Sequence, residues 1–105
     1  MNVLIEFDAL PWQHPAEGVR FKAFRHGTQQ LRLVEFSPGF TEDEWCTNGH
    51  AVHVLEGTLT FLLKRGDTVV FREGDVAFLR AGEEDAHRAS VGAERPARLL
   101  LFELV

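Results

Sequence analysis

Four side chains that can bind a metal ion stand out in this sequence. Glu44, Cys46 and His50 lie close together, and His87 follows far downstream. Thiolate and imidazole suit zinc, iron, nickel or cobalt better than magnesium or calcium, and a carboxylate is compatible with them. Two negative charges from the thiolate and the carboxylate would balance a divalent ion. The sequence therefore predicts a divalent transition-metal site, with zinc or iron as the leading ions and nickel, cobalt or manganese as further candidates.

Strand periodicity predicts that these side chains meet on one face. Residues two apart in an extended strand point the same way, so Glu44 and Cys46 share a face. His50 follows the Asn48-Gly49 turn as the inward histidine of the next strand, whereas His53 faces the other side. A distant strand can supply His87 as the fourth ligand.

Other interpretations of the same residues remain open. A single cysteine or inward histidine is often a buried core residue, so the chain could also hold an empty polar pocket. If all four side chains bind, a zinc site is closed; if Glu44 leaves, three ligands and a water make an open, Lewis-acidic centre. Glu44 is also the inward carboxylate that could serve as a general base.

Short stretches rich in Val, Leu, Phe and Thr predict the elements that must position these residues. Each stretch ends at Gly, Pro, Asn or Asp, which is typical of an all-β sandwich or barrel. Residues 10–18 are expected to form a loop that is able to lay Trp12 over an opening, although Trp12 is expected to be a packing residue. The predicted strands are Val3–Phe7, Val19–Arg25, Gln29–Phe36, His50–Leu55, Thr58–Lys64, Thr68–Arg72, Asp75–Leu79, Ala86–Val91 and Ala97–Val105.

The spacing around the candidate ligands resembles the first cupin motif. That motif has a Gly, then His-x-His, three or four residues, a Glu, six residues and a Gly. Counting back from Gly57 puts His50 in the Glu place and Cys46 and Glu44 in the two His places. The resemblance implies a cupin-type jelly-roll β-barrel, a single domain over residues 1–105, with a metal held in its pocket.

The second cupin motif is matched less closely. Gly74 and Gly82 fit, but Arg80 stands where Pro is usual and His87 comes two residues late, which a longer turn could absorb. The acidic turn 83–85 is expected to be a solvated rim. The run Asp43–Cys46, followed by His50, also resembles a group of small cupins named for Asp, His, Cys and Trp, which have His in place of Glu44.

Composition and charge limit the partners. At 105 residues the chain suits one domain, and its net charge of -5, with scattered Lys and Arg, argues against nucleic acid. Early acidic residues and short apolar runs predict no signal peptide and no membrane span, hence a cytoplasmic protein. A single cysteine, Cys46, excludes an intrachain disulfide.

The last predicted strand, Ala97–Val105, is apolar on both faces, so a second copy of the chain is expected to cover one of them. The apolar strand Val3–Phe7 could join that homodimer interface. The alternative is a terminal strand covered on both faces within one chain.

Three functions remain open at this point. The first is a metal-dependent enzyme acting on a small organic molecule in the barrel pocket. The second is a non-catalytic module that binds or senses a small molecule or metal. The third is a purely structural metal site. Fold resemblance alone does not choose among them.

Overall fold

Alternation of apolar and polar residues builds the strands of this protein, whose computed structural model describes residues 3–105. In β4, for example, His50, Val52 and Val54 are buried and the residues between them are more exposed. The elements of the described chain are η1 (Phe7–Ala9), β1 (Gln13–Ala16), β2 (Val19–His26), β3 (Gln29–Phe36), β4 (His50–Glu56), β5 (Leu59–Leu63), β6 (Thr68–Phe71), β7 (Val76–Leu79), β8 (His87–Val91) and β9 (Ala97–Leu104).

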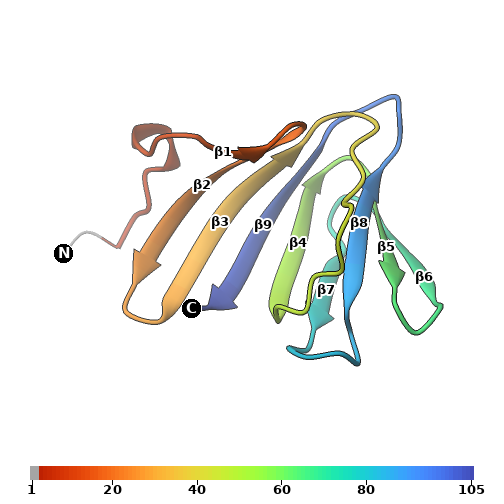
Figure 1. The fold of residues 1–105 in the computed structure, drawn as a ribbon. Helices are drawn as coiled ribbons and strands as arrows, with labels where there is room; N and C mark the ends of the chain where they lie inside the picture. Colours follow the sequence, from red (N-terminus) through yellow and green to blue (C-terminus); the bar gives the residue numbers. More distant parts are fainter. Residues whose placement is uncertain (1–2) are drawn as a thin grey trace.

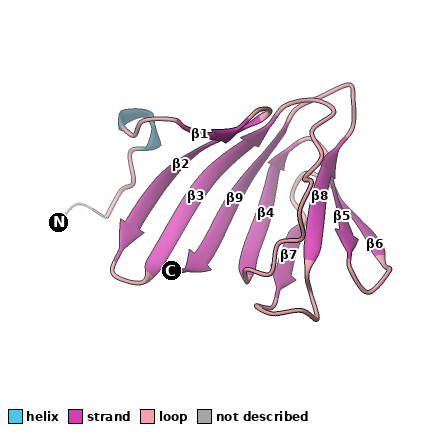
Figure 2. Cartoon of the chain, in the orientation of Figure 1, coloured by secondary structure: helices cyan, strands magenta, loops and turns pink. Residues whose placement is uncertain are grey.

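These strands form two antiparallel sheets, as Figures 1 and 2 show. The larger sheet has the order β1-β2-β3-β9-β4-β7, and the smaller has the order β6-β5-β8. The predicted all-β fold is thus confirmed as a two-sheet sandwich. The described chain contains no helix long and apolar enough to cross a membrane.

The apolar core lies where the smaller sheet faces β9, β4 and β7. Leu59, Leu99, Val52 and Val54 are its largest fully buried side chains. Phe21 on β2 is only partly buried, so the core thins out toward that side of the larger sheet. This uneven closure leaves an opening between the layers, beside β2 and β3.

The prediction for the N-terminal segment is wrong in two places. Residues 3–6 form no strand, Val3 is 93% exposed, and the chain turns into η1 at Phe7. Gln13–Ala16, expected to be a loop, forms β1 and pairs with β2 through the Gly18 turn. Its Pro15 is tolerated because β1 is an edge strand.

Trp12 is a packing residue, as expected, and does not cover the opening. Its ring stacks under the guanidinium of Arg20 at 3.9 Å, with the Lys22 ammonium 4.8 Å from the ring centroid. Lys22 also donates a hydrogen bond to the carbonyl oxygen of Phe7. The N-terminal segment is therefore fastened to the outer surface of β2.

The last strand, β9, is apolar on both faces, but the described chain buries only one of them. Leu99 and Leu101 point into the core, whereas Phe102 and Leu104 on the other face are 40% and 72% exposed. The alternative of a terminal strand covered on both faces within one chain is therefore wrong.

Candidate metal centre

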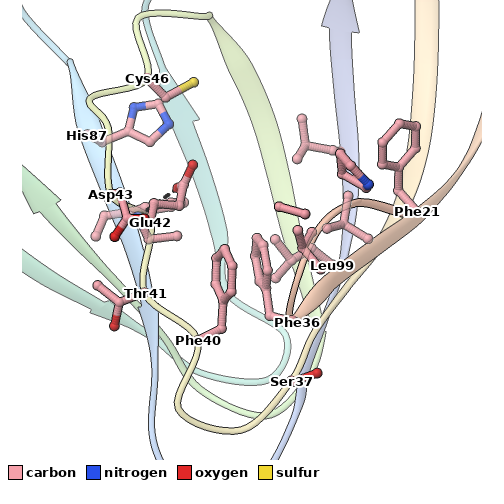
Figure 3. Close-up of a pocket in the computed structure, with 18 of the residues that line it drawn as sticks. Phe21, Phe36, Ser37, Phe40, Thr41, Glu42, Asp43, Cys46, His87 and Leu99 are labelled. Atoms are coloured by element: carbon pink, nitrogen blue, oxygen red, sulfur yellow. Dashed lines mark hydrogen bonds between the residues drawn. The ribbon is translucent and has the colours of Figure 1, made fainter. Parts of the chain in front are cut away.

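A cavity of about 920 Å³ opens between the larger sheet and the segment 37–49 (Figure 3). One part of its wall is apolar and includes the stacked rings of Phe36 and Phe40, whose centroids are 4.7 Å apart. The other part is polar and includes Cys46, His50 and His87. The cavity therefore joins a cluster of metal-binding side chains to a surface suited to an apolar molecule.

Three of the four predicted ligands come together in this wall. One ligand atom from each of Cys46, His50 and His87 lies within 4.8 Å of the other two, so the three could hold a metal ion. Cys46 Sγ and His50 Nε2 are 3.6 Å apart. Both histidines are buried and Cys46 is half-buried, which limits competition from water while keeping the cluster open to the cavity.

Backbone pairing places Cys46 beside His87. The N–H of Cys46 donates to the carbonyl oxygen of His87 at 2.8 Å, and the N–H of His87 donates back at 3.0 Å. In an antiparallel pair, residues joined in this way project side chains on the same side. His87 begins β8, so the smaller sheet holds both candidate ligands.

His50 comes from the larger sheet, as the first residue of β4. The preceding Gly49 allows this approach, because a Cβ there would lie 2.9 Å from the backbone nitrogen of Ala81. Strand alternation turns His50 inward and leaves His53 exposed, in agreement with the predicted periodicity. The cluster therefore spans the two layers.

The tautomer of His87 suits metal binding. Its Nδ1 lies 2.9 Å from the carbonyl oxygen of Asp85, and a carbonyl can only accept, so Nδ1 carries the proton. The unprotonated Nε2 is then free for a metal. An edge-on contact with the Phe61 ring, at 5.1 Å between centroids, also holds the imidazole in place.

His50 has a carboxylate on its far side. Its Nδ1 lies 3.0 Å from Glu103 Oε2 as an ion-pair contact and makes no regular hydrogen bond within residues 3–105. Burial opposes ionisation of Glu103, but hydrogen bonds from Arg32 and Gln30 outweigh it and hold the pKa of Glu103 below its usual value. An ionised acceptor thus stands beside His50.

The donor set fits a divalent transition metal. One thiol and two imidazoles are ligands that zinc, iron, nickel and cobalt accept. His87 has its Nδ1 occupied by a backbone acceptor, and His50 has its Nδ1 beside Glu103, an arrangement common around histidine ligands. The side chains of this cluster therefore meet the requirements of a metal centre.

Glu44, the fourth predicted ligand, lines the same cavity but is exposed and does not belong to the three-residue cluster. The hydrogen bonds of this segment explain its position. Glu42 pairs with Ala89, and Cys46 pairs with His87. The chain therefore advances four residues from Glu42 to Cys46, while β8 advances only two between their partners. The excess chain bends outward around Glu44. Coordination of a metal by Glu44 stays a prediction.

Glu42 is the carboxylate that the bend leaves on the cavity side, and it was not among the predicted site residues. Its Oε1 accepts a 2.8 Å hydrogen bond from the N–H of Ala89, and its side chain lines the cavity near His87 (Figure 3). Burial raises its pKa, against the lowering effects of that hydrogen bond and of the nearby His87 and Arg32. Its even spacing from Cys46 was the available signal.

The longer turn before His87 has a buried support. Asp85 accepts hydrogen bonds from the backbone N–H, Nε and Nη2 of Arg80, and a further one from Arg65. These contacts hold the pKa of Asp85 well below its usual range. Glu83 and Glu84 are exposed as expected for a solvated rim, but Asp85 is buried, so the prediction was wrong for that residue.

Comparison with solved structures supports the same fold. The polyketide cyclase RemF from Streptomyces resistomycificus is 18% identical, with 99% of this chain and 80% of that chain covered and a TM-score of 0.82. A cupin-superfamily sugar phosphate isomerase from Silicibacter pomeroyi is 18% identical, with 97% and 75% covered and a TM-score of 0.79.

The EutQ protein of Clostridium difficile is 20% identical, with 82% of this chain and 67% of that chain covered and a TM-score of 0.68. A search of curated proteins found no match. The family model of the EutQ-like cupin domain matches residues 23–96, which is most of the chain. This protein therefore belongs to the EutQ-like cupin domain family.

Proposed function

We propose that this chain binds one divalent transition metal through Cys46, His50 and His87 and uses it to act on a small organic molecule in the adjoining cavity. The observation that carries the proposal is the joint placement of the cluster and the cavity: three metal-binding atoms within 4.8 Å of one another face a space of about 920 Å³. Three protein ligands leave a coordination position for water or substrate.

The residues around the cluster support a substrate with both an apolar and a polar part. Phe36 and Phe40 offer a flat apolar surface, and Glu42 offers a carboxylate that can accept a hydrogen bond or a proton. A metal at this position would polarise a carbonyl or activate water or oxygen. Zinc and iron are the leading candidates, and nickel, cobalt and manganese remain compatible with the ligands.

The alternative is a non-catalytic module that binds or senses a metal or a small molecule. The same open cluster serves either role, since binding needs the cavity and the coordination position but no proton transfer. The presence of Glu42 beside the cluster favours an enzyme. Two of the similar structures are described as a cyclase and an isomerase, which shows that this fold can carry catalysis but does not assign a reaction to this chain.

We also propose that the chain belongs to the small cupins named for Asp, His, Cys and Trp, and that it is cytoplasmic. Asp43, Trp45 and Cys46 support the group assignment, with Glu44 as the departure from it. Trp45 stacks on the Arg88 guanidinium at 4.4 Å, so its part in the motif is packing of the segment onto β8.

A homodimer remains the proposed assembly, through the outer face of the larger sheet. Two cross-strand rows of mostly apolar residues run over β3, β9, β4 and β7, and Phe78 and Val76 in them are 79% and 66% exposed. A face of this kind can pair with itself around a two-fold axis. The rows are Leu31, Phe102, Ala51 and Phe78, and Leu33, Leu100, His53 and Val76.

Elemental analysis of protein purified without chelator tests the proposal. We expect close to one transition-metal ion per chain, and loss of that ion in His50→Ala and His87→Ala. His53→Ala is the matched control, because it removes an exposed imidazole from the same strand. Protein that carries no transition metal and takes up none on reconstitution would contradict the proposal.

Cobalt substitution then separates an open site from a structural one. Azide or cyanide should shift the visible spectrum of the cobalt protein if a coordination position is free. A visible spectrum that neither azide nor cyanide changes would identify a closed, structural metal site and would rule out chemistry at the metal.

A further inference from the structure

Glu103 lies beside His50 and is itself held by Arg32 and Gln30. These three residues have no role in the proposed function described above. Glu103, on the inner face of β9, is 7% exposed and lies 3.0 Å from His50 Nδ1, and the His50 side chain is 6% exposed. A buried carboxylate beside a buried imidazole is costly unless both are held by partners. The burial of Glu103 beside His50 therefore needs an explanation in terms of its partners.

Glu103 is fixed from the other side. Arg32 Nη2 donates to its Oε2 at 3.1 Å, and the Arg32 guanidinium also lies 2.7 Å from its Oε1. Gln30 Nε2 donates to the same Oε1 at 2.7 Å. These two residues belong to β3, which pairs directly with β9. The carboxylate is thus anchored before it meets the histidine.

Both candidate histidine ligands have an oxygen acceptor near Nδ1, with a regular hydrogen bond at His87 and a 3.0 Å ion-pair contact at His50. His87 presents its Nδ1 to the backbone oxygen of Asp85, and His50 presents its Nδ1 to Glu103. In both cases the opposite nitrogen, Nε2, is left for the cluster, and His50 Nε2 lies 3.6 Å from Cys46 Sγ. Arg32 and Gln30 donate to the Glu103 oxygens, which makes these oxygens acceptors, and an acceptor 3.0 Å from His50 Nδ1 favours the tautomer with the proton on Nδ1.

We propose that Glu103 is a positioning residue that, anchored by Arg32 and Gln30, keeps the His50 proton on Nδ1 and so presents Nε2 to a metal. The inference rests on the proposed metal-binding function. It extends the metal centre across the larger sheet to a residue far from the ligands in sequence. Arg32 also lines the cavity, so the same network borders the space for the small molecule.

Glu103→Gln tests this role because it keeps the size of the side chain but offers either an amide oxygen or an N–H to His50. In the metal-free protein, nitrogen-15 NMR of the imidazoles should show His50 as the Nδ1–H tautomer in the wild type and as a mixture in the variant. Zinc affinity, measured by competition with a chromophoric chelator, should fall by about 10- to 100-fold.

Glu35→Gln is the matched control. Glu35, on the neighbouring strand β3, is likewise a carboxylate paired with arginines, Arg20 and Arg98, but it lies on the opposite face of the sheet. Its zinc affinity should stay within about twofold of the wild type, since distant sites behave independently. Should Glu103→Gln fail to fold, Glu103→Asp replaces it, because it keeps the charge but withdraws the carboxylate from His50.

The outcomes separate the two proposals. Wild-type protein that binds no zinc contradicts the proposed function, while the NMR of metal-free protein still tests the positioning of His50. Wild-type protein that binds zinc, together with a Glu103 variant of unchanged affinity and unchanged tautomer, overturns the positioning role alone.

Discussion

Cys46 and His87 exchange two backbone hydrogen bonds, at 2.8 and 3.0 Å, although they are far apart in the sequence. Two of the three candidate ligands are therefore fixed by the backbone itself, independently of a metal. Only His50, from the other sheet, has to be brought to them by packing of the layers. A site built in this way is preorganised, and metal binding should need little rearrangement.

Cys46→Ser is expected to abolish the thiolate charge-transfer band of the cobalt protein and to weaken cobalt binding. A hydroxyl is a poor ligand for these ions, so two histidines would remain. Ultraviolet–visible absorption during cobalt titration checks this. An unchanged band would show that Cys46 is not a ligand, and a thermal-unfolding control on the metal-free variant shows whether the fold is kept.

Glu42→Gln and Glu44→Gln form a matched pair of variants. They test which of the two carboxylates affects the binding of an anion to the metal. Replacing the half-buried carboxylate of Glu42 by an amide should tighten azide binding to the cobalt protein by about three- to tenfold, whereas the exposed carboxylate of Glu44 is screened by water. The azide titration is followed by the visible spectrum. If Glu44 coordinates the metal, the order reverses, because its loss frees a position for azide.

The difference between these two carboxylates also marks where the sequence stops being informative. Alternation correctly places His50 inward and His53 outward, because both lie in a regular strand. It does not place Glu44, because the bend at that residue arises from pairing with β8, a strand far away in sequence. Period-two reasoning holds only while the strand stays regular.

Long-range partners explain the other differences as well. The sequence predicts Asp85 to be a surface residue in an acidic turn. Its burial depends on hydrogen bonds from Arg80 and Arg65, which the local sequence pattern does not indicate. The mostly apolar residues 3–7 satisfy strand propensity, but the structure forms no strand over 3–6 and begins η1 at Phe7. The fold class and the clustering of Cys46, His50 and His87 were predictable, since they depend on turn residues and spacing.

Asp85→Asn should lower the melting temperature at neutral pH, because it weakens the hydrogen bonds from Arg80 and Arg65. The pKa of Asp85 is depressed in the folded state, so its contribution is complete above the unfolded value near 4 and is lost as the pH falls below it. The difference in melting temperature between wild type and variant should therefore shrink from pH 5 to pH 2.

Glu84→Gln is the control for that measurement. Glu84 pairs with Arg80 at 2.8 Å, but its side chain is 75% exposed, so its loss should cost no more than about 0.5 kcal/mol. A Glu84 variant as unstable as the Asp85 variant would show that the turn is sensitive to charge in general and not to the buried aspartate.

Phe78→Glu should convert the proposed homodimer into a monomer of normal thermal stability. A charge on the outer face of β7 would be buried unpaired in a paired assembly but would be solvated in a single chain. Light scattering after size exclusion measures the mass. Leu62→Glu, on the outer side of the smaller sheet, is the control and should leave the mass unchanged. A monomeric wild type at micromolar concentration would refute the dimer.

The position of β9 in the larger sheet has a consequence for folding kinetics. β9 follows all the other strands in sequence, yet it lies between β3 and β4, as Figure 1 shows. Gln30 and Glu103, which it brings into contact, are 73 residues apart. The two halves of the sheet cannot join until this strand is inserted, so loop closure must precede most of the stabilising contacts. Refolding should then take milliseconds to seconds, as for other topologies dominated by non-local pairs. The support of His50 by Glu103 forms only with that final insertion.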